Sequence, residues 1–295
     1  MSDTADRNGG FTTDLRGYRP KVSQSDIARI ITDSTSGTTG DCKRVYYTAS
    51  DLERTVEIFM QGISELCQDK ILVAFPSTGE YSLGSLICDA VERIGSVPVP
   101  LEAGLSYHNM VNIIEKEKPG GFIGFPQLLL ALQRITGGCF SAGLISGDYC
   151  IRADYLCPVF PHYGSREMGL AGAISCRCRE GMHMRPDVEI EIIDPEGRSV
   201  PDGVEGELVI STPLMEAMPL ERYRTGDYTY IIPEPCPCGS DRVRIGPVRR
   251  RTAIETADDI AFADPELLDV RGERRITVNN LKAEDKPLFK AKRHG

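Results

Sequence analysis

The amino-acid sequence predicts an α/β protein, in which layered parallel strands with crossover helices are followed by an antiparallel β subdomain. Between residues 50 and 146, short apolar runs alternate with stretches of helical spacing, the pattern of a parallel sheet. From about residue 185 onward, apolar residues recur at every second position, as in antiparallel strands. A chain of 295 residues can bury one large core or two unequal domains.

The first half of the chain supplies the parallel part. Residues 50–67 predict a helix because Leu52, Val56 and Phe59 begin a series at helical spacing, and Ser50 with Glu53 forms a capping box. Strands are then expected at residues 71–75, 97–99, 122–125, 143–146 and 158–160, and helices at residues 83–94, 109–116 and 127–135. This alternation is the reason for predicting crossover helices.

The connection between the last two of these strands is short. Residues 143–148 and 158–160 are separated by the nine residues 149–157. A parallel crossover usually needs about a dozen residues or more. Two alternatives follow: the connection is an extended loop, or the sheet is rearranged at this point.

The second half supplies the antiparallel part. Val188, Ile190 and Ile192 alternate with polar residues, and the turn at residues 194–197 follows them. Further strands are expected at residues 207–211 and 228–232, with another at 275–278. Beyond residue 246 the sequence becomes charged and irregular.

The composition excludes several classes of protein. A formal net charge of -9 and an isoelectric point near 5.1 argue against a general nucleic-acid binder. No stretch approaches the roughly 18 apolar residues of a membrane helix, and residues 1–10 are polar, unlike a signal peptide. We therefore expect a soluble, cytoplasmic protein.

Residues 34–43 have the composition of a phosphate-binding loop. The run contains hydroxyl side chains, Gly37, Gly40 and Lys43. Glycine lets backbone N–H groups approach an anion, while hydroxyls and a lysine add further donors. The spacing is not that of a Walker loop, and the alternative interpretation is a flexible linker.

Close cysteine pairs indicate a metal site. Cys176 and Cys178 form one pair, Cys236 and Cys238 the other, and His183 follows Cys176 by seven residues. In a reducing compartment such pairs favour a metal over a disulfide. Cys176, His183, Cys236 and Cys238 would make a closed Cys₃His set suited to structural zinc, with Cys178 as the alternative ligand and free thiols as the alternative interpretation.

Four segments, in this order, resemble the acyl-adenylate-forming (AMP-binding) superfamily, and specifically its phenylacetate-CoA ligase branch. They are residues 34–43, Tyr163-Gly164-Ser165-Arg166-Glu167, Tyr223-Arg224-Thr225-Gly226-Asp227, and the Cys236-Pro237-Cys238-Gly239 turn. The resemblance covers residues 20–251. It implies the fold of the large N-terminal domain of adenylate-forming ligases. It also implies a reaction in which a carboxylate and ATP give acyl-AMP and pyrophosphate, usually followed by transfer to the thiol of coenzyme A.

The resemblance assigns roles residue by residue. In the loop it implies that Ser36, Gly37, Thr38, Thr39, Gly40 and Lys43 bind the β and γ phosphates. Elsewhere it implies that Tyr163 and Gly164 lie beside adenine, that Glu167 holds Mg²⁺, that Asp227 binds the ribose, and that Arg251 contacts the nucleotide. Arg166 stands where the family has a threonine that bonds the α-phosphate.

The same resemblance predicts the domain organisation and the partners. Residues 1–246 would form the large AMP-binding domain, and residues 247–295 a reduced remnant of the C-terminal lid, because only 44 residues follow Arg251. The expected substrate is a small carboxylic acid, an aryl acid by family default, and a homodimer is the oligomer to test. The alternative function is a catalytically degenerate paralogue that binds nucleotide or acyl ligand as a sensor or scaffold. A zinc-stabilised interaction module is a third reading.

Overall fold

A computed structural model describes residues 10–33, 43–77, 79–146 and 155–250, together with the short strand pair β16 (Leu268–Asp269) and β17 (Lys290–Ala291). The chain divides into two compact units. Unit 1 contains Met1–Ile58, Tyr163–Ile174 and Glu180–Arg249, and unit 2 contains Phe59–His162, Ser175–Arg179 and Arg250–Gly295. The strand predicted at residues 275–278 lies outside the described residues.

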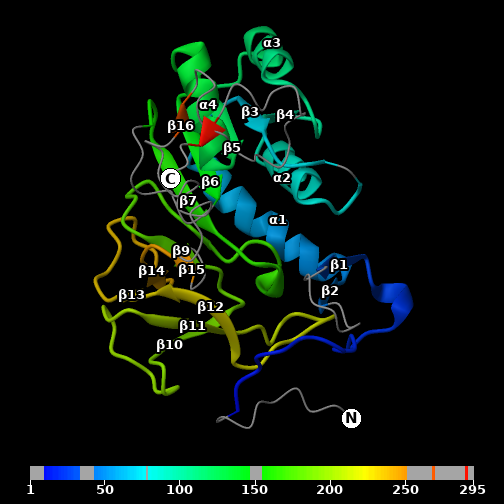
Figure 1. Ribbon diagram of the computed structural model, residues 1–295, viewed down its shortest axis with the longest axis vertical. Coiled ribbons are helices and arrows are strands. Elements are labelled where there is room, and N and C mark those ends of the chain that lie inside the picture. The colour runs from blue at the N-terminus through cyan, green and yellow to red at the C-terminus, as the bar shows by residue number, and fades with distance from the viewer. Residues whose placement is uncertain are drawn as a thin grey trace. The chain divides into compact units, whose positions relative to one another are not determined.

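Unit 2 holds the predicted parallel sheet. Its strands lie in the order β4-β3-β5-β6-β7, all parallel (Figure 1). In chain order the elements are β3 (Lys70–Val73), α2 (Leu83–Arg93), β4 (Val97–Pro100), α3 (Tyr107–Glu117), β5 (Gly121–Gly124), α4 (Pro126–Thr136), β6 (Ala142–Ser146) and β7 (Val159–Tyr163). The prediction of parallel strands with crossover helices is confirmed.

The short connection before β7 does not disturb the sheet. β6 and β7 pair directly as parallel strands, from Gly143 opposite Val159 to Ser146 opposite His162. The rearranged-sheet alternative is therefore wrong. Residues 155–158 of the connection form neither helix nor strand, and residues 147–154 lie outside the described residues.

Local signals explain where the helices of unit 2 begin and end. The hydroxyls of Ser82 and Ser106 accept hydrogen bonds from the N–H groups three residues later, at 3.2 and 3.3 Å, which caps α2 and α3. α4 begins with Pro126 and ends before Gly137, whose φ of 74° is left-handed. The core between α3, α4 and the sheet is apolar, with residues at most 1% exposed that include Leu72, Met110, Phe122, Leu129 and Ile145.

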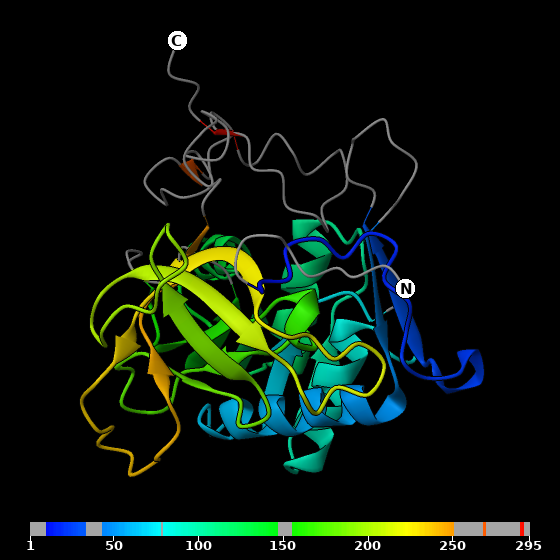
Figure 2. The ribbon, with the colours of Figure 1, turned by 90° about the horizontal axis from the view of Figure 1, so that it is seen from below.

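Unit 1 contains the predicted antiparallel part. Its sheets are the β1-β2 hairpin, the sheet β10-β11-β12-β15 and the antiparallel set β13-β14-β9-β8. Figure 2 shows β10, β11 and β12, coloured from yellow-green to yellow, side by side. The elements are η1 (Gln24–Asp26), β1 (Arg29–Asp33), β2 (Lys43–Tyr47), η2 (Arg166–Met168), β8 (Ala173–Ile174), β9 (Met182–Met184), β10 (Glu189–Ile193), β11 (Gly206–Ser211), β12 (Tyr223–Thr229), β13 (Ile231–Ile232), β14 (Arg244–Ile245) and β15 (Arg249–Arg250).

One strand prediction was wrong. The strand expected at residues 228–232 is two strands, because β12 ends at Thr229 and β13 begins at Ile231. β12 begins earlier than predicted, at Tyr223, and includes the charged Arg224. Arg224 is tolerated there because it forms an ion pair with the buried Glu207 of β11, a partner that the alternation of apolar residues does not reveal.

The first long helix, α1 (Ala49–Ser64), was predicted correctly, but its cap was not. The cap is Thr48 with Asp51: the Asp51 N–H donates to Thr48 Oγ1 at 3.1 Å, and the Thr48 N–H donates to Asp51 Oδ2 at 3.0 Å. Asp51 also accepts the backbone N–H groups of Glu216 and Ala217, at 2.7 and 3.1 Å. These distant partners favour Thr48 and Asp51 over the predicted pair. Among the described residues, no helix has the length and apolar character to cross a bilayer.

Candidate nucleotide site and metal centre

The loop after β7 carries three of the predicted site residues and is tightly closed. A side chain at Gly164 would place its Cβ 2.1 Å from the carbonyl oxygen of Leu170, so only glycine fits there. The Gly172 N–H donates to the Tyr163 carbonyl at 2.9 Å, and the Leu170 N–H donates to the Ser165 carbonyl at 2.8 Å. Glu167 lies in η2 within this loop and is buried.

A buried arginine supports the loop. Arg185 Nη1 donates to the carbonyls of Met168 and Ala171 at 2.9 and 2.8 Å. Its Nε and Nη2 donate to the two carboxylate oxygens of Asp187, both at 2.6 Å. Burial alone would raise the pKa of Asp187. The hydrogen bonds and charge of Arg185 outweigh burial, so the pKa of Asp187 is below its usual value. Arg185 was not predicted from the sequence, because its carbonyl partners, Met168 and Ala171, lie in a distant segment that no motif connects to it.

The structure brings Tyr163 and Asp227 together from positions 64 residues apart. The Tyr163 hydroxyl donates to Asp227 Oδ2 at 2.7 Å. Asp227 lies on β12 and is buried, and its N–H donates to Thr225 Oγ1 at 3.1 Å. A carboxylate has acceptor capacity beyond one hydrogen bond, so this pair is compatible with a further hydroxyl partner.

Arg166 has a solvent-exposed side chain and a well-anchored backbone. Its carbonyl accepts a hydrogen bond from the hydroxyl of Tyr47, on β2, at 2.6 Å. Burial, and then the negative charge of Glu167, raise the pKa of Tyr47, so its hydroxyl remains a donor. Tyr47 thus connects the β1-β2 hairpin to the loop that carries Arg166 and Glu167.

Several predicted residues lie outside the described part of the chain. They are Ser36, Gly37, Thr38, Thr39 and Gly40 of the loop, and Arg251. Lys43 is the first residue of β2, opposite Asp33 at the end of β1. The two strands that flank the predicted phosphate loop are therefore antiparallel neighbours.

The predicted metal ligands form a cluster. One ligand atom from each of Cys176, His183, Cys236 and Cys238 lies within 4.8 Å of the others, and Cys178 is not in the group. His183 Nε2 lies 3.4 Å from Cys238 Sγ, while His183 Nδ1 is buried with no hydrogen-bond partner among the described residues. One imidazole nitrogen together with three thiols, all within this distance, makes a donor set that fits a tetrahedral metal such as zinc.

The backbone turn and the arginines around the four ligand residues favour their arrangement as a metal site. The Gly239 N–H donates to the Cys236 carbonyl at 3.0 Å, and Gly239 has a φ of 84°, so the Cys-Pro-Cys-Gly segment forms a tight turn. Arg244, opposite His183 in the register of β14 and β9, donates to the carbonyls of Glu180 and Glu234. Burial, followed by the charge of Arg242, lowers the pKa of His183 and favours the neutral imidazole.

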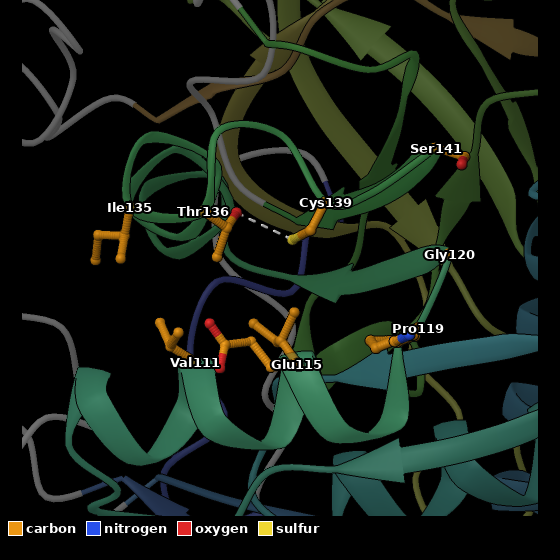
Figure 3. A pocket seen from close by; sticks show the side chains of 10 residues that line it. Val111, Glu115, Pro119, Gly120, Ile135, Thr136, Cys139 and Ser141 are labelled. Carbon is orange, nitrogen blue, oxygen red and sulfur yellow. Dashed lines mark hydrogen bonds between the residues drawn. The ribbon is translucent and has the colours of Figure 1, made fainter.

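A separate cavity of about 620 Å³ lies in unit 2 between α3 and α4 (Figure 3). Its lining residues are Val111, Ile114, Glu115, Lys118, Pro119, Gly120, Ile135, Thr136, Cys139 and Ser141. Gly120 and Ser141 directly precede β5 and β6, so the cavity lies at the amino ends of these strands. None of the predicted site residues lines it.

Comparisons with known proteins place the chain in a family. Residues 3–218 match the family described as AMP-binding enzyme. The phenylacetate-coenzyme A ligase of Thermus thermophilus is 29% identical over 267 residues, covering 81% of this chain and 59% of that protein. The phenylacetate-coenzyme A ligase of Aromatoleum evansii is 28% identical over 250 residues, covering 75% and 55%. The chain thus spans somewhat over half the length of these relatives.

Solved structures agree on the fold. A 2-hydroxyisobutyryl-CoA ligase in its postadenylation state has a TM-score of 0.65 at 20% identity, covering 78% of this chain and 53% of that one. The o-succinylbenzoate coenzyme A synthetase of Bacillus subtilis, in complex with AMP, has a TM-score of 0.53 at 20% identity, covering 78% and 63%. With the family match over most of the sequence, the chain belongs to the AMP-binding enzyme family, as a phenylacetate-CoA ligase-like member with an α/β adenylate-forming fold.

Proposed function

We propose that this chain activates a carboxylic acid, with an aryl acid as the substrate class, by forming acyl-AMP and pyrophosphate from ATP. In this proposal the thiol of coenzyme A is the acceptor in a second step. The observation that carries it is the pairing of Tyr163 with Asp227 at 2.7 Å beside the closed loop that holds Glu167. These are the residues expected to hold adenine, ribose and Mg²⁺.

The buried carboxylates suit these roles. Glu167 is only 8% exposed and lies in a loop fixed on both sides, so it would hold Mg²⁺ without reorganisation. Asp227 would accept hydrogen bonds from the ribose hydroxyls while Tyr163 keeps its carboxylate in place. Bound Mg²⁺ would neutralise charge on the phosphate oxygens while the carboxylate attacks. Ser36, Gly37, Thr38, Thr39, Gly40, Lys43 and Arg251 stay predicted contacts.

Pyrophosphate exchange tests the proposal. With ATP, Mg²⁺ and a panel of aryl and small aliphatic acids, we expect exchange that depends on one class of acid. Glu167→Gln should lower the exchange rate by about 100-fold or more, since it removes a charge from a preorganised site. Glu189→Gln, an exposed position on β10, is the matched control and should keep the full rate. Background exchange across the whole panel would contradict the proposal.

Nucleotide binding without turnover is the second candidate. Arg166, which stands where the related enzymes are expected to have threonine, favours it because a guanidinium cannot reproduce the geometry of a hydroxyl. Tight AMP binding combined with background exchange would support this candidate. The cytoplasmic localisation and the homodimer remain predictions from the sequence.

We also propose that Cys176, His183, Cys236 and Cys238 bind a structural zinc ion. Three thiolates and one imidazole leave no open position for a catalytic water. The purified protein should contain about one zinc per chain, as measured by elemental analysis. Cys238→Ser should lose the metal and Cys178→Ser should keep it, whereas equal zinc content in all three proteins would contradict the assignment.

A further inference from the structure

A second arginine, Arg29, lies on the hairpin whose Tyr47 contacts the backbone of Arg166. Arg29 is on β1, directly opposite Tyr47 in the antiparallel register of the β1-β2 hairpin. Residues directly opposite each other project from the same face of such a pair. The Tyr47 hydroxyl reaches the Arg166 carbonyl at 2.6 Å. Tyr47 therefore has Arg29 beside it on the hairpin and the backbone of Arg166 at its hydroxyl, and all three residues belong to unit 1.

The charges of the two arginines interact. Burial is the largest cause that lowers the pKa of Arg29, and the positive charge of Arg166 lowers it further. This agrees with the strand register and the Tyr47 hydrogen bond, which bring Arg29 and the backbone of Arg166 to the same tyrosine. Glu167 lies in the same neighbourhood, since its charge acts on Tyr47. Arg29 is half-buried and Arg166 is exposed, so solvent can reach the pair; like charges repel, and an anion bound between them relieves that repulsion.

We propose that Arg29 and Arg166 together bind a phosphate group of the nucleotide. Guanidinium groups match phosphate oxygens in a two-pronged geometry, which suits this ligand better than a single ammonium would. The α-phosphate is the group in question, because the β and γ phosphates are assigned to residues 34–43. The pair takes the place of the threonine hydroxyl that this chain lacks. This inference rests on the proposed adenylate-forming function.

Titration calorimetry with AMP and adenosine tests the inference. Arg29→Gln should weaken AMP binding by about 10- to 100-fold, the range for a hydrogen bond to a charged group, and should leave adenosine binding within about twofold. Arg44→Gln is the matched control, because it removes the same charge from the same hairpin. Arg44 is exposed and lies opposite Thr32, one position out of phase with Arg29 and Tyr47, so it projects from the other face. It should bind AMP as the unmodified chain does.

A second variant separates binding from folding. Arg29→Lys keeps the charge and loses the two-pronged geometry, so its AMP affinity should lie between those of the unmodified chain and Arg29→Gln. Unchanged AMP affinity in Arg29→Gln, or an equal loss for adenosine and AMP, would overturn the inference. Inorganic phosphate is the third ligand: if it binds as tightly as AMP and with the same dependence on Arg29, the site is a general anion site and the nucleotide assignment is wrong.

The outcome is distinguishable from that of the proposed function. Exchange at background with AMP binding that depends on Arg29 would reject adenylation and keep the arginine pair. Active exchange with AMP affinity unchanged in Arg29→Gln would do the reverse. An unmodified chain that binds no AMP would reject the pair directly.

Discussion

The interiors of the two units differ in kind. In the described part of unit 2 the buried polar side chains are Gln133, His162 and Ser175, and the remaining core is apolar. Unit 1 instead buries side chains that carry full charges, namely Asp51, Glu167, Arg185, Glu207, Asp227 and Arg244. Because an unpaired buried charge is very costly, such charges persist only where partners are fixed.

The difference indicates what each unit is built to do. Unit 2 is stabilised by apolar burial, which is non-directional and tolerates changes in shape. Unit 1 also has an apolar core, which includes Ile193, Leu208 and Ile210, but it adds directional bonds to buried charges. Asp51, for example, accepts hydrogen bonds from Thr48, Arg54, Glu216 and Ala217. Directional bonds fix the positions of polar groups, which a site requires. The predicted nucleotide residues described here accordingly lie in unit 1.

The largest expected effect is on the buried ion pair of Arg185 and Asp187 in unit 1. Arg185→Met should lower the free energy of unfolding by about 3–5 kcal/mol, because it leaves Asp187 and two carbonyls without a buried partner. Chemical denaturation at pH 7 measures this. Loss of AMP affinity should accompany it, since the loop of Glu167 is released. A loss below 1 kcal/mol would mean that the buried charges of unit 1 are not its main support.

The contribution of the Arg185–Asp187 pair to the free energy of unfolding depends on pH, and the pKa of Asp187 sets the direction of that dependence. Its pKa in the folded state is below the unfolded value of about 3.9, so its contribution is complete above that value. The contribution is lost as the pH falls through the lower folded-state pKa. In Arg185→Met the hydrogen bonds and charge of Arg185, which lower the pKa of Asp187, are absent, so the variant should lose less stability than the unmodified chain as the pH falls below about 3.9.

The next effect is on the apolar core of unit 2. Leu129→Ala should cost about 3 kcal/mol of unfolding free energy, because Leu129 is fully buried and its removal leaves a cavity. Val97→Ala, at a position that is 52% exposed on β4, should change stability by less than about 0.5 kcal/mol. Folded Leu129→Ala should bind AMP with unchanged affinity. A loss of AMP affinity in folded Leu129→Ala would contradict the assignment of the apolar core of unit 2 to stability alone.

His162 is a buried titratable side chain in the mostly apolar interior of unit 2, and it should make a smaller, pH-dependent contribution to stability. His162 is buried, its Nδ1 lies 2.6 Å from Ser146 Oγ, and burial lowers its pKa to about 4. The folded value is below the unfolded value of about 6.5, so this contribution is complete above pH 6.5 and is lost as the pH falls towards 4. Stability should fall by at most about 1.4 kcal/mol per pH unit in that window. His162→Gln should flatten this part of the profile, and an unchanged slope would contradict the assignment.

The smallest effect concerns a single hydroxyl in unit 1. Tyr163→Phe removes the hydrogen bond to Asp227 but keeps an aromatic ring, so stability should fall by about 1 kcal/mol. AMP affinity should fall only a few-fold, whereas Tyr163→Ala should lose more because stacking is removed as well. Equal losses in the two variants would show that the hydroxyl, and not the ring, serves the nucleotide.

Local patterns predicted most of the unit 2 elements and fewer details of unit 1. The helix expected at residues 83–94 is Leu83–Arg93, and that at 127–135 is Pro126–Thr136, because their apolar spacing is regular. The first part of β12 was not predicted, because the charged Arg224 is accommodated there by its ion pair with Glu207, 17 residues away. The cap of α1 escaped because Asp51 finds its decisive partners 165 and 166 residues further along the chain.

The same reason applies to the site. Tyr163, Glu167 and Asp227 were predicted because short motifs contain them. Arg185 was missed because its role depends on carbonyls of Met168 and Ala171, which no motif encodes. Arg29 was missed because its relation to Arg166 passes through Tyr47 on another strand. Motifs report residues that meet ligands, while the residues that hold them in place depend on long-range contacts.

The division of the chain also has a consequence for how the protein is made. Most of unit 2 comes from the single stretch Phe59–His162, whereas unit 1 is assembled from three stretches that extend to Arg249. Contacts between distant stretches slow folding, and domains generally fold as units during synthesis. On the ribosome, unit 2 is therefore expected to be compact first. Asp51 would then stay hydrated until its backbone partners, 165 and 166 residues further along the chain, have been translated.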